Sequence, residues 1–315
     1  MFRDFFLYLN MIDRNIKYFF IKFLGLFSVV RGYNIFVIVI AQYMASVFIF
    51  AEHKTILQVL TDGNLFLIVF SSTLAIAGGY IINNFYDSEK DLINRPKKTM
   101  LDKLVSQEFK LRVYFTLNFF AVILSLLVSW QAAAFFSIYI FLLWFYSHKL
   151  KKYTFIGNLT AALVAVLPFF GVLMYFKNFH TVIFVHATLV YLLILIRELI
   201  KDLTSIKGDF ANNYRTIPVV YGEQFAKYSI SFLSVLVLFP CLLLMYNYNV
   251  GYMNYFLYFA LFILGVINIL LYKTDVTSGY KKIHLLMKIL ILIGIFSILL
   301  IDAKIIQYGK AFLLP

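Results

Sequence analysis

Long apolar runs separated by short polar segments recur along the whole chain. A helix that crosses the ~30 Å hydrocarbon core of a membrane needs roughly 17 to 25 apolar residues, because each residue adds about 1.5 Å along the axis. The runs are apolar on every face, whereas strands of a membrane barrel would alternate apolar and polar residues. The pattern predicts an all-α, polytopic membrane protein with nine transmembrane helices. Their expected ranges are 33–50, 64–86, 113–130, 132–146, 156–175, 181–200, 228–245, 252–272 and 283–301.

The composition agrees with this pattern, since 63% of the residues are hydrophobic and 14% are charged. The formal net charge of +13 is unevenly distributed, and 24 of the 28 basic residues fall toward one side of the predicted bundle. Cytoplasmic segments of membrane proteins carry such an excess of lysine and arginine. We therefore expect an integral protein of the cell inner membrane, with the polar loops 88–110 and 201–227 in the cytoplasm and the C-terminus outside. The charge is a topology signal, so no nucleic-acid partner is expected.

The domain organisation follows from where the polar residues lie. Residues 1–27 mix charged and aromatic side chains, which favours an amphipathic segment at the membrane interface and not a cleavable signal peptide. The second and sixth apolar runs each end in acids and amides followed by a basic loop. This indicates that two halves of one bundle, 33–301, share a cytoplasmic-facing active-site cavity. We expect a single domain over residues 1–315.

The first polar cluster contains Asn83, Asp87 and Asp91, each four residues from the next. On a helix, positions four apart lie on one face about 6 Å apart along the axis. Three oxygen-bearing side chains would then face one point. Mg²⁺ prefers such oxygens and completes its shell with water and phosphate oxygens.

The second cluster has Glu198 and Asp202 one helical turn apart, and Asp209 seven residues further on. Gly208 could end the helix and aim Asp209 separately, so two arrangements stay open. A lone acid at the end of a membrane helix is often only an interfacial charge, but ladders in two spans weaken that alternative. Acids for a metal beside bases for phosphate favour a diphosphate clamp. The nearby bases are Arg197, Lys201, Lys207 and Arg215.

At these residues the sequence resembles the UbiA superfamily of intramembrane prenyltransferases, whose first motif is Asn-x3-Asp-x3-Asp. Asn83, Asp87 and Asp91 match that motif completely. The second motif departs from the family at Ser205, where many members have an acid, which puts one metal ligand in doubt. Weaker resemblances extend over most of the chain and include Arg31, Asn34, Tyr146, Ser147, Leu150, Lys151, Lys152, Gly157, Asn158, Thr216, Pro218 and Gly222.

The resemblance implies a Mg²⁺-dependent transferase that moves a polyprenyl group, with geranylgeranyl expected, from its diphosphate to a lipophilic acceptor in membrane lipid. Implied metal ligands are Asn83, Asp87, Asp91, Glu198, Asp202 and Asp209. The acids Asp87, Asp91, Asp202 and Asp209 would be catalytic together with Tyr146, whose ring, like that of Tyr80, could stabilise an allylic cation. Implied substrate-binding residues are Arg31, Asn34, Asn83, Arg95, Lys98, Lys151, Arg197, Lys201, Ser205 and Arg215. Arg95, Lys97 and Lys98 could also close over the site as a lid.

Within the superfamily, segments 91–96 and 197–209 most resemble digeranylgeranylglyceryl phosphate synthase-like members, which implies a prenylglyceryl phosphate acceptor. An aromatic quinone precursor, haem and chlorophyllide stay open as acceptors. An ion-coupled transporter is the alternative from another class, and it predicts acids near the bilayer midplane. A non-catalytic assembly protein is also left open by Ser205. Prenyl length and oligomeric state are not indicated by the residues.

Overall fold

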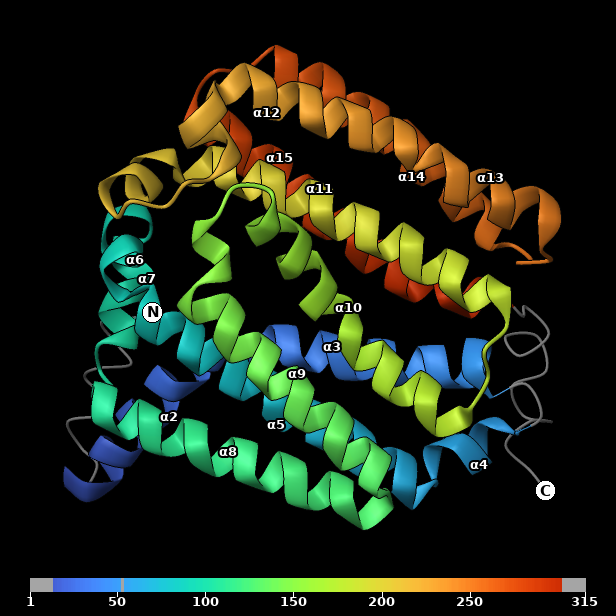
Figure 1. Ribbon diagram of the computed structural model, residues 1–315, viewed down its shortest axis with the longest axis horizontal. Coiled ribbons are helices and arrows are strands. Elements are labelled where there is room, and N and C mark those ends of the chain that lie inside the picture. Colours follow the sequence, from blue (N-terminus) through green and yellow to red (C-terminus); the bar gives the residue numbers. More distant parts are fainter. Residues whose placement is uncertain (1–13, 52–53, 302–315) are drawn as a thin grey trace.

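The computed structural model describes residues 14–51 and 54–301, and all regular elements in these ranges are helical (Figure 1). The α-helices are α2 (Arg14–Val30), α3 (Gly32–Ala45), α4 (Ile56–Leu60), α5 (Gly63–Tyr86), α6 (Ser88–Asn94), α7 (Pro96–Asp102), α8 (Gln107–Val128), α9 (Trp130–His148), α10 (Ile156–Phe176), α11 (Thr181–Ala211), α12 (Ile217–Leu236), α13 (Leu238–Asn247), α14 (Met253–Tyr272) and α15 (Thr277–Ser297). Short η segments are Ser46–Phe50, Leu150–Lys152 and Ile298–Leu300.

Nine helical segments within the described ranges are long and apolar enough to cross a membrane, which confirms the predicted number. They are Gly32–Phe50, Gly63–Tyr86, Gln107–Val128, Trp130–Lys152, Ile156–Phe176, Thr181–Ala211, Ile217–Asn247, Met253–Tyr272 and Thr277–Leu300. Large apolar side chains such as Phe119, Phe232 and Phe262 are exposed on the outside of the bundle. Such surfaces suit lipid as the solvent. The protein is an integral, polytopic membrane protein.

Two hydrophobic clusters build the bundle in two parts. One joins α11 to α12, α13, α14 and α15 around residues such as Ile196 and Met287. The other joins α3, α5, α9 and α10 around residues such as Leu65 and Phe136. A smaller cluster between α10 and α11 connects the two parts, with Ala162 packed near Ile194. In Figure 1, α10 and α11 run through the middle of the molecule between these parts.

The two long polar loops expected at 88–110 and 201–227 are largely helical, so this part of the prediction was wrong. The first contains α6 and α7, and the second is divided between the end of α11 and the start of α12. Gly208 does not end α11, which continues to Ala211. A Cβ at Gly208 would lie 2.3 Å from Asn94 Nδ2, so this glycine permits close contact between α6 and α11. The contact brings the segment after α5 against the second acidic cluster.

The interfacial segment expected at residues 1–27 lies only partly within the described residues. Residues 1–13 lie outside the described ranges, and α2 runs on to Val30. A left-handed backbone at Arg31, with φ of 52°, separates α2 from α3. Ser28 Oγ donates a hydrogen bond to Asp102 Oδ1 at 2.8 Å, which ties α2 to α7. The end of α2 therefore forms part of the packed protein.

Candidate active site

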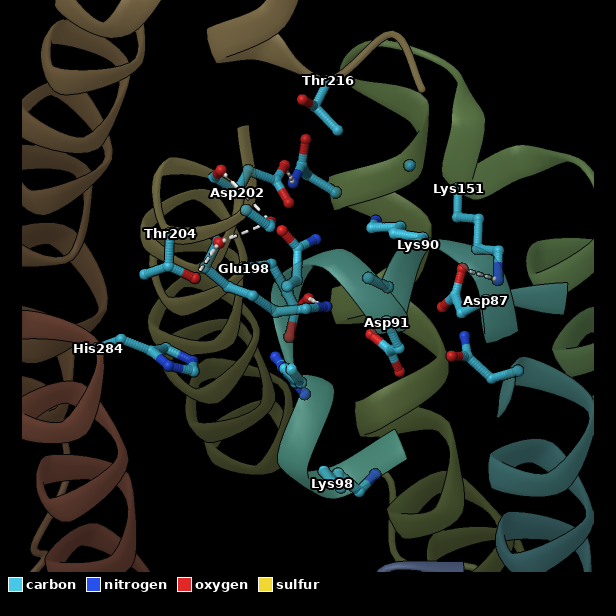
Figure 2. A pocket seen from close by; sticks show the side chains of 18 of the residues that line it. Asp87, Lys90, Asp91, Lys98, Lys151, Glu198, Asp202, Thr204, Thr216 and His284 are labelled. Carbon is cyan, nitrogen blue, oxygen red and sulfur yellow. Dashed lines mark hydrogen bonds and ion pairs between the residues drawn. The ribbon is translucent and has the colours of Figure 1, made fainter. Parts of the chain in front are cut away.

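A cavity of about 560 Å³ lies where α5, α6, α10, α11 and α15 converge (Figure 2). Its wall combines acids, amides and basic side chains, and most of the predicted site residues lie on it. These are Arg31, Asn83, Asp87, Asp91, Arg95, Lys98, Tyr146, Lys151, Glu198, Lys201, Asp202 and Ser205. Segments far apart in the sequence thus contribute to one polar space. Several of these groups lie near the ends of their helices, as Asn83 does in α5 and Tyr146 in α9.

Four predicted site residues do not line this cavity. Asn34 donates from Nδ2 to the Tyr80 hydroxyl at 3.5 Å, and Tyr80 also lies off the wall. Arg197 is paired with a neighbouring acid, and Arg215 is exposed, with its main-chain N–H bonded to the Lys152 carbonyl at 3.0 Å. Asp209 is fully buried behind the wall. Arg197 and Asp209 contact residues of the wall, Glu198 and Lys90 respectively.

The first motif keeps its helical register across the junction between α5 and α6. The Asp87 N–H donates to the Asn83 carbonyl at 3.0 Å, and the Asp91 N–H donates to the Asp87 carbonyl at 2.8 Å. The four-residue spacing therefore places Asn83, Asp87 and Asp91 on one wall of the cavity. Asp91 has no ion-pair partner among residues 14–51 and 54–301, so its carboxylate is available to a ligand.

Asp87 is held by two partners from other elements. Lys151 Nζ lies 2.8 Å from Asp87 Oδ1, and the Tyr214 hydroxyl donates to the same oxygen at 2.8 Å. Burial raises the pKa of Asp87, but the positive charges of Lys151 and Lys90 outweigh burial and leave this pKa below its ordinary value. Asp87 is therefore an anion around neutral pH, as a metal ligand must be.

The acids of the second motif have distinct environments on α11. Glu198 accepts from Arg197 and from Lys201, each at 2.6 Å. Asp202 Oδ2 accepts from Asn158 Nδ2 at 2.7 Å, which fixes the orientation of its carboxylate. Asp202 has no basic ion-pair partner among the residues described by the structure. Like Asp91 in the first motif, Asp202 therefore has a carboxylate that is available to a ligand.

Asp209 is connected to the cavity through Lys90, which lies between the two motifs. Lys90 Nζ is 2.6 Å from Asp209 Oδ1 and 4.2 Å from the Tyr214 ring centroid. Burial lowers the pKa of Lys90, but the charges of Asp209 and Asp87 outweigh burial and raise it. Ser205 Oγ also lies 3.3 Å from Asp209 Oδ2. The ammonium of Lys90 thus links the two acidic motifs.

The segment with Arg95 and Lys98, predicted as a lid, is anchored by Asp102. Asp102 accepts from Asn84 Nδ2 at 2.9 Å as well as from α2, and Lys98 Nζ lies 3.7 Å from it. Burial and the positive charge of Arg31 lower the pKa of Lys98. The basic side chains of this segment therefore reach the cavity from a helix that Asp102 ties to α2 and α5.

The sequence reasoning missed several residues at the site. Lys90 lies inside the first motif, but spacing alone did not indicate that it contacts Asp209. Tyr214 had no signal, since it contacts Asp87 only through the fold. A further signal was present in the spacing of three basic or imidazole side chains on α15, which all line the cavity: Lys281, His284 and Lys288.

The donor set fits a magnesium ion bound together with a diphosphate. No three His, Cys, Asp or Glu side chains in the described part of the chain are close enough to hold a metal ion alone. Carboxylates from both motifs nevertheless face one cavity, and Asp91 and Asp202 are free of basic partners there. Mg²⁺ is commonly held by one or two carboxylates, with water and substrate phosphates completing its shell.

Comparison with known proteins decides the family. The sequence matches the UbiA prenyltransferase family over residues 43–292. The chain belongs to this family. Digeranylgeranylglyceryl phosphate synthase of Thermococcus gammatolerans is 30% identical over 247 residues, covering 76% of this chain and 86% of the relative. The synthase of the same name from Sulfurisphaera tokodaii is 26% identical over 258 residues, covering 81% and 90%.

Solved structures show that the chain has the UbiA fold. A digeranylgeranylglyceryl phosphate synthase structure aligns with a TM-score of 0.67 at 21% identity, covering 88% of this chain and 97% of the other. A UbiA homolog from Archaeoglobus fulgidus bound to GPP and Mg²⁺ aligns with a TM-score of 0.65 at 12% identity, covering 87% and 99%. Family membership and fold make this protein a membrane-embedded prenyltransferase, and the transporter and assembly-protein alternatives are set aside.

Proposed function

We propose that this UbiA family member uses Mg²⁺ to transfer a geranylgeranyl group from its diphosphate to a prenylglyceryl phosphate. The main support is that acids from two distant motifs, Asp87 with Asp91 and Asp202, face the same cavity among basic side chains. The names of the relatives favour a glyceryl phosphate acceptor over an aromatic ring, haem or chlorophyllide. Residues 1–315 would act as one domain.

The donor diphosphate would bind between the two motifs. Magnesium held by Asn83, Asp87, Asp91 and Asp202 would neutralise the diphosphate as a leaving group. Lys151 and Lys201 line the cavity and now pair with carboxylates, so they are placed to move to phosphate oxygens when the donor arrives. That exchange costs little, because each ammonium leaves one anion for another.

Glu198 and Asp209 take supporting positions in this proposal. The oxygens of Glu198 already accept from Arg197 and Lys201, so it can bind metal only after these bases turn to the diphosphate. Asp209 stays behind the wall and positions Lys90. Arg31, Arg95, Lys98 and Ser205 would contact substrate from the cavity wall. Asn34, Arg197 and Arg215 would support neighbouring groups or bind phosphate only after a rearrangement.

The reaction would break the bond between the first prenyl carbon and the diphosphate oxygen, leaving an allylic cation. Tyr146 lines the cavity, and the face of its ring can attract that cation. The acceptor hydroxyl oxygen then bonds to the prenyl carbon, and its proton leaves with the diphosphate. This step would require water to be kept away from the cation, because water would otherwise capture it as an alcohol.

The cavity would open toward the cytoplasm in the cell inner membrane. The basic residues that surround it obey the positive-inside rule in that orientation. Both prenyl chains would lie between helices or in adjoining lipid, because they are too apolar for water. Membrane lipid and the two prenyl substrates are thus the proposed partners, and no nucleic acid is required.

The direct test is product analysis by mass spectrometry on the purified protein in lipid with Mg²⁺. Labelled geranylgeranyl diphosphate would be supplied with a competing panel of geranylgeranylglyceryl phosphate, 4-hydroxybenzoate, 1,4-dihydroxy-2-naphthoate and haem B. We expect a doubly prenylated glyceryl phosphate. A prenylated ring or haem as the main product would refute the acceptor and keep the transfer chemistry.

A further inference from the structure

A second group of basic side chains enters the cavity from α15, outside both acidic motifs. Lys281, His284 and Lys288 are spaced by three and four residues and all line the cavity. Such positions lie on one face of a helix, so they form a stripe about 10 Å long. In Figure 2, His284 reaches in from α15 across the cavity from Asp87 and Lys151.

These side chains have no acidic partner in the described part of the chain, in contrast to Lys151 and Lys201. Within residues 14–51 and 54–301, Lys281, His284 and Lys288 make no ion pair, whereas Lys151 and Lys201 each contact a carboxylate. Lys288 lies in a membrane-spanning helix, more than two turns from its start. Charged side chains at such positions are rare and mark substrate pathways.

The charge of the cavity supports a second anion. Nine lysine and arginine side chains line it, against four acids. A prenyl diphosphate brings about three negative charges and each magnesium ion returns two positive ones, so the donor with its metal leaves most of this surplus in place. Another ligand with a negative charge would offset the remainder.

We propose that Lys281, His284 and Lys288 form a separate site for the phosphate monoester of a lipid acceptor. The same helix exposes Leu285 and Ile289 beside this stripe. A single-chain glyceryl phosphate could therefore place its phosphate on the basic stripe and its chain along apolar surface. The assignment rests on the proposed function for the acceptor, and it adds the residues that distinguish a phosphorylated acceptor from a neutral one.

The first experiment separates acceptor binding from donor binding. Steady-state kinetics with geranylgeranyl diphosphate and geranylgeranylglyceryl phosphate would compare Lys281→Gln, Lys288→Gln and the double variant. The matched control is Lys282→Gln, because Lys282 is an exposed neighbour on α15 that does not line the cavity. We expect the double variant to raise the acceptor KM about tenfold or more, with the donor KM and the control unchanged. An equal rise in donor KM would overturn the proposal.

A second experiment needs no transfer, so it distinguishes this inference from the proposed function. Binding of lysophosphatidic acid and of monoacylglycerol to the full-length protein in detergent would be measured for the double variant and the control. We expect the wild type and Lys282→Gln to prefer the phosphate-bearing lipid by about tenfold, and the double variant to lose the preference. Equal binding of both lipids by the wild type would refute the site.

Competition experiments then distinguish a site for a lipid phosphate from a site for a free phosphate ion. Inorganic phosphate should compete with lysophosphatidic acid only at about a hundredfold higher concentration, since it lacks an apolar chain. Competition at similar concentrations would show a free-anion site and overturn the lipid assignment. If prenylglyceryl phosphate is not prenylated but the α15 variants still abolish lipid-phosphate preference, the phosphate site stands and the proposed acceptor fails.

Discussion

Helix α5 has an aspartate at each end, and only one of the two caps the helix with its side chain. Asp62 is the N-cap, and its Oδ1 accepts from the N–H groups of Asn64 and Leu65 at 3.1 Å. Asp87 lies at the junction of α5 and α6, where its side chain makes no capping hydrogen bond to either helix. The first acid satisfies the helix that carries it, whereas the second requires partners from elsewhere in the fold.

The partners show what each acid serves. Lys54 and Tyr175 contact Asp62 at 2.9 and 2.8 Å, so this carboxylate is surrounded by groups that stabilise it. Burial raises the pKa of Asp62, but Lys54 and the capping bonds outweigh burial and lower it. Asp87 depends on Lys151 and faces a cavity. An acid that caps no helix and faces a cavity is a candidate functional residue, while an acid that caps a helix is explained by stability alone.

Removal of metal should have the largest effect on prenyl transfer, and it should not affect Asp62 at the other end of α5. We expect EDTA to reduce prenyl transfer by about a thousandfold or more, because the diphosphate would leave with its charge uncompensated, and added Mg²⁺ to restore it. The measurement is product formation from labelled donor, with thermal unfolding recorded on the same samples. Transfer that persists without divalent metal would contradict the mechanism.

Exchanging each acid for its amide sharpens the comparison. Asp87→Asn should lower the rate of transfer by about a thousandfold, since the amide keeps the shape and loses the charge that binds metal. Asp202→Asn should behave alike. The matched control is Asp62→Asn, which retains an N-cap oxygen and should keep full activity. Comparable activity losses at Asp62 and Asp87 would remove the distinction between the two ends.

Substitution of Lys90 tests whether its ion pair with Asp209 stabilises the fold. Lys90→Met leaves Asp209 buried without its cation, which should lower the free energy of unfolding by about 3 kcal/mol. The double variant Lys90→Met/Asp209→Asn removes the unpaired charge and should recover part of that loss. Thermal or denaturant unfolding in detergent would measure both. No recovery in the double variant would show that Lys90 does not act through Asp209.

Gly208→Ala probes the contact between α6 and α11. The new methyl group would overlap the Asn94 side chain, so either this side chain or α6 must shift, and a shift of α6 would carry Asp91 with it. We expect a severalfold rise in donor KM, of the size that small displacements of binding groups produce. Adding Asn94→Ala should relieve the overlap and restore the KM. A persistent defect in the double variant would place the cause elsewhere.

The smallest expected effect is at the other end of α5. Asp62→Ala removes an N-cap and should destabilise the protein by about 1 kcal/mol, seen as a lower midpoint of thermal unfolding. Transfer below the unfolding temperature should remain at the wild-type rate. A large loss of activity from the folded variant would mean that the capping end communicates with the site.

Some of the site followed directly from spacing along one helix. The four-residue intervals of Asn83, Asp87 and Asp91 placed all three on one wall, and the register survives the junction of α5 and α6. The uncertain element was Gly208, which was a possible helix end and instead allows a close contact. A glycine has both uses, and the neighbouring helix decides between them.

The sequence by itself determined the class of protein, the nine membrane helices and the acidic motifs, because apolar run length and helical spacing are properties of a single segment. Only the tertiary structure decided that Asp209 lies behind the cavity on Lys90, that Tyr214 holds Asp87, and that α15 faces the motifs. These contacts join residues distant in the chain. They depend on how helices pack against one another, which spacing within one helix does not specify.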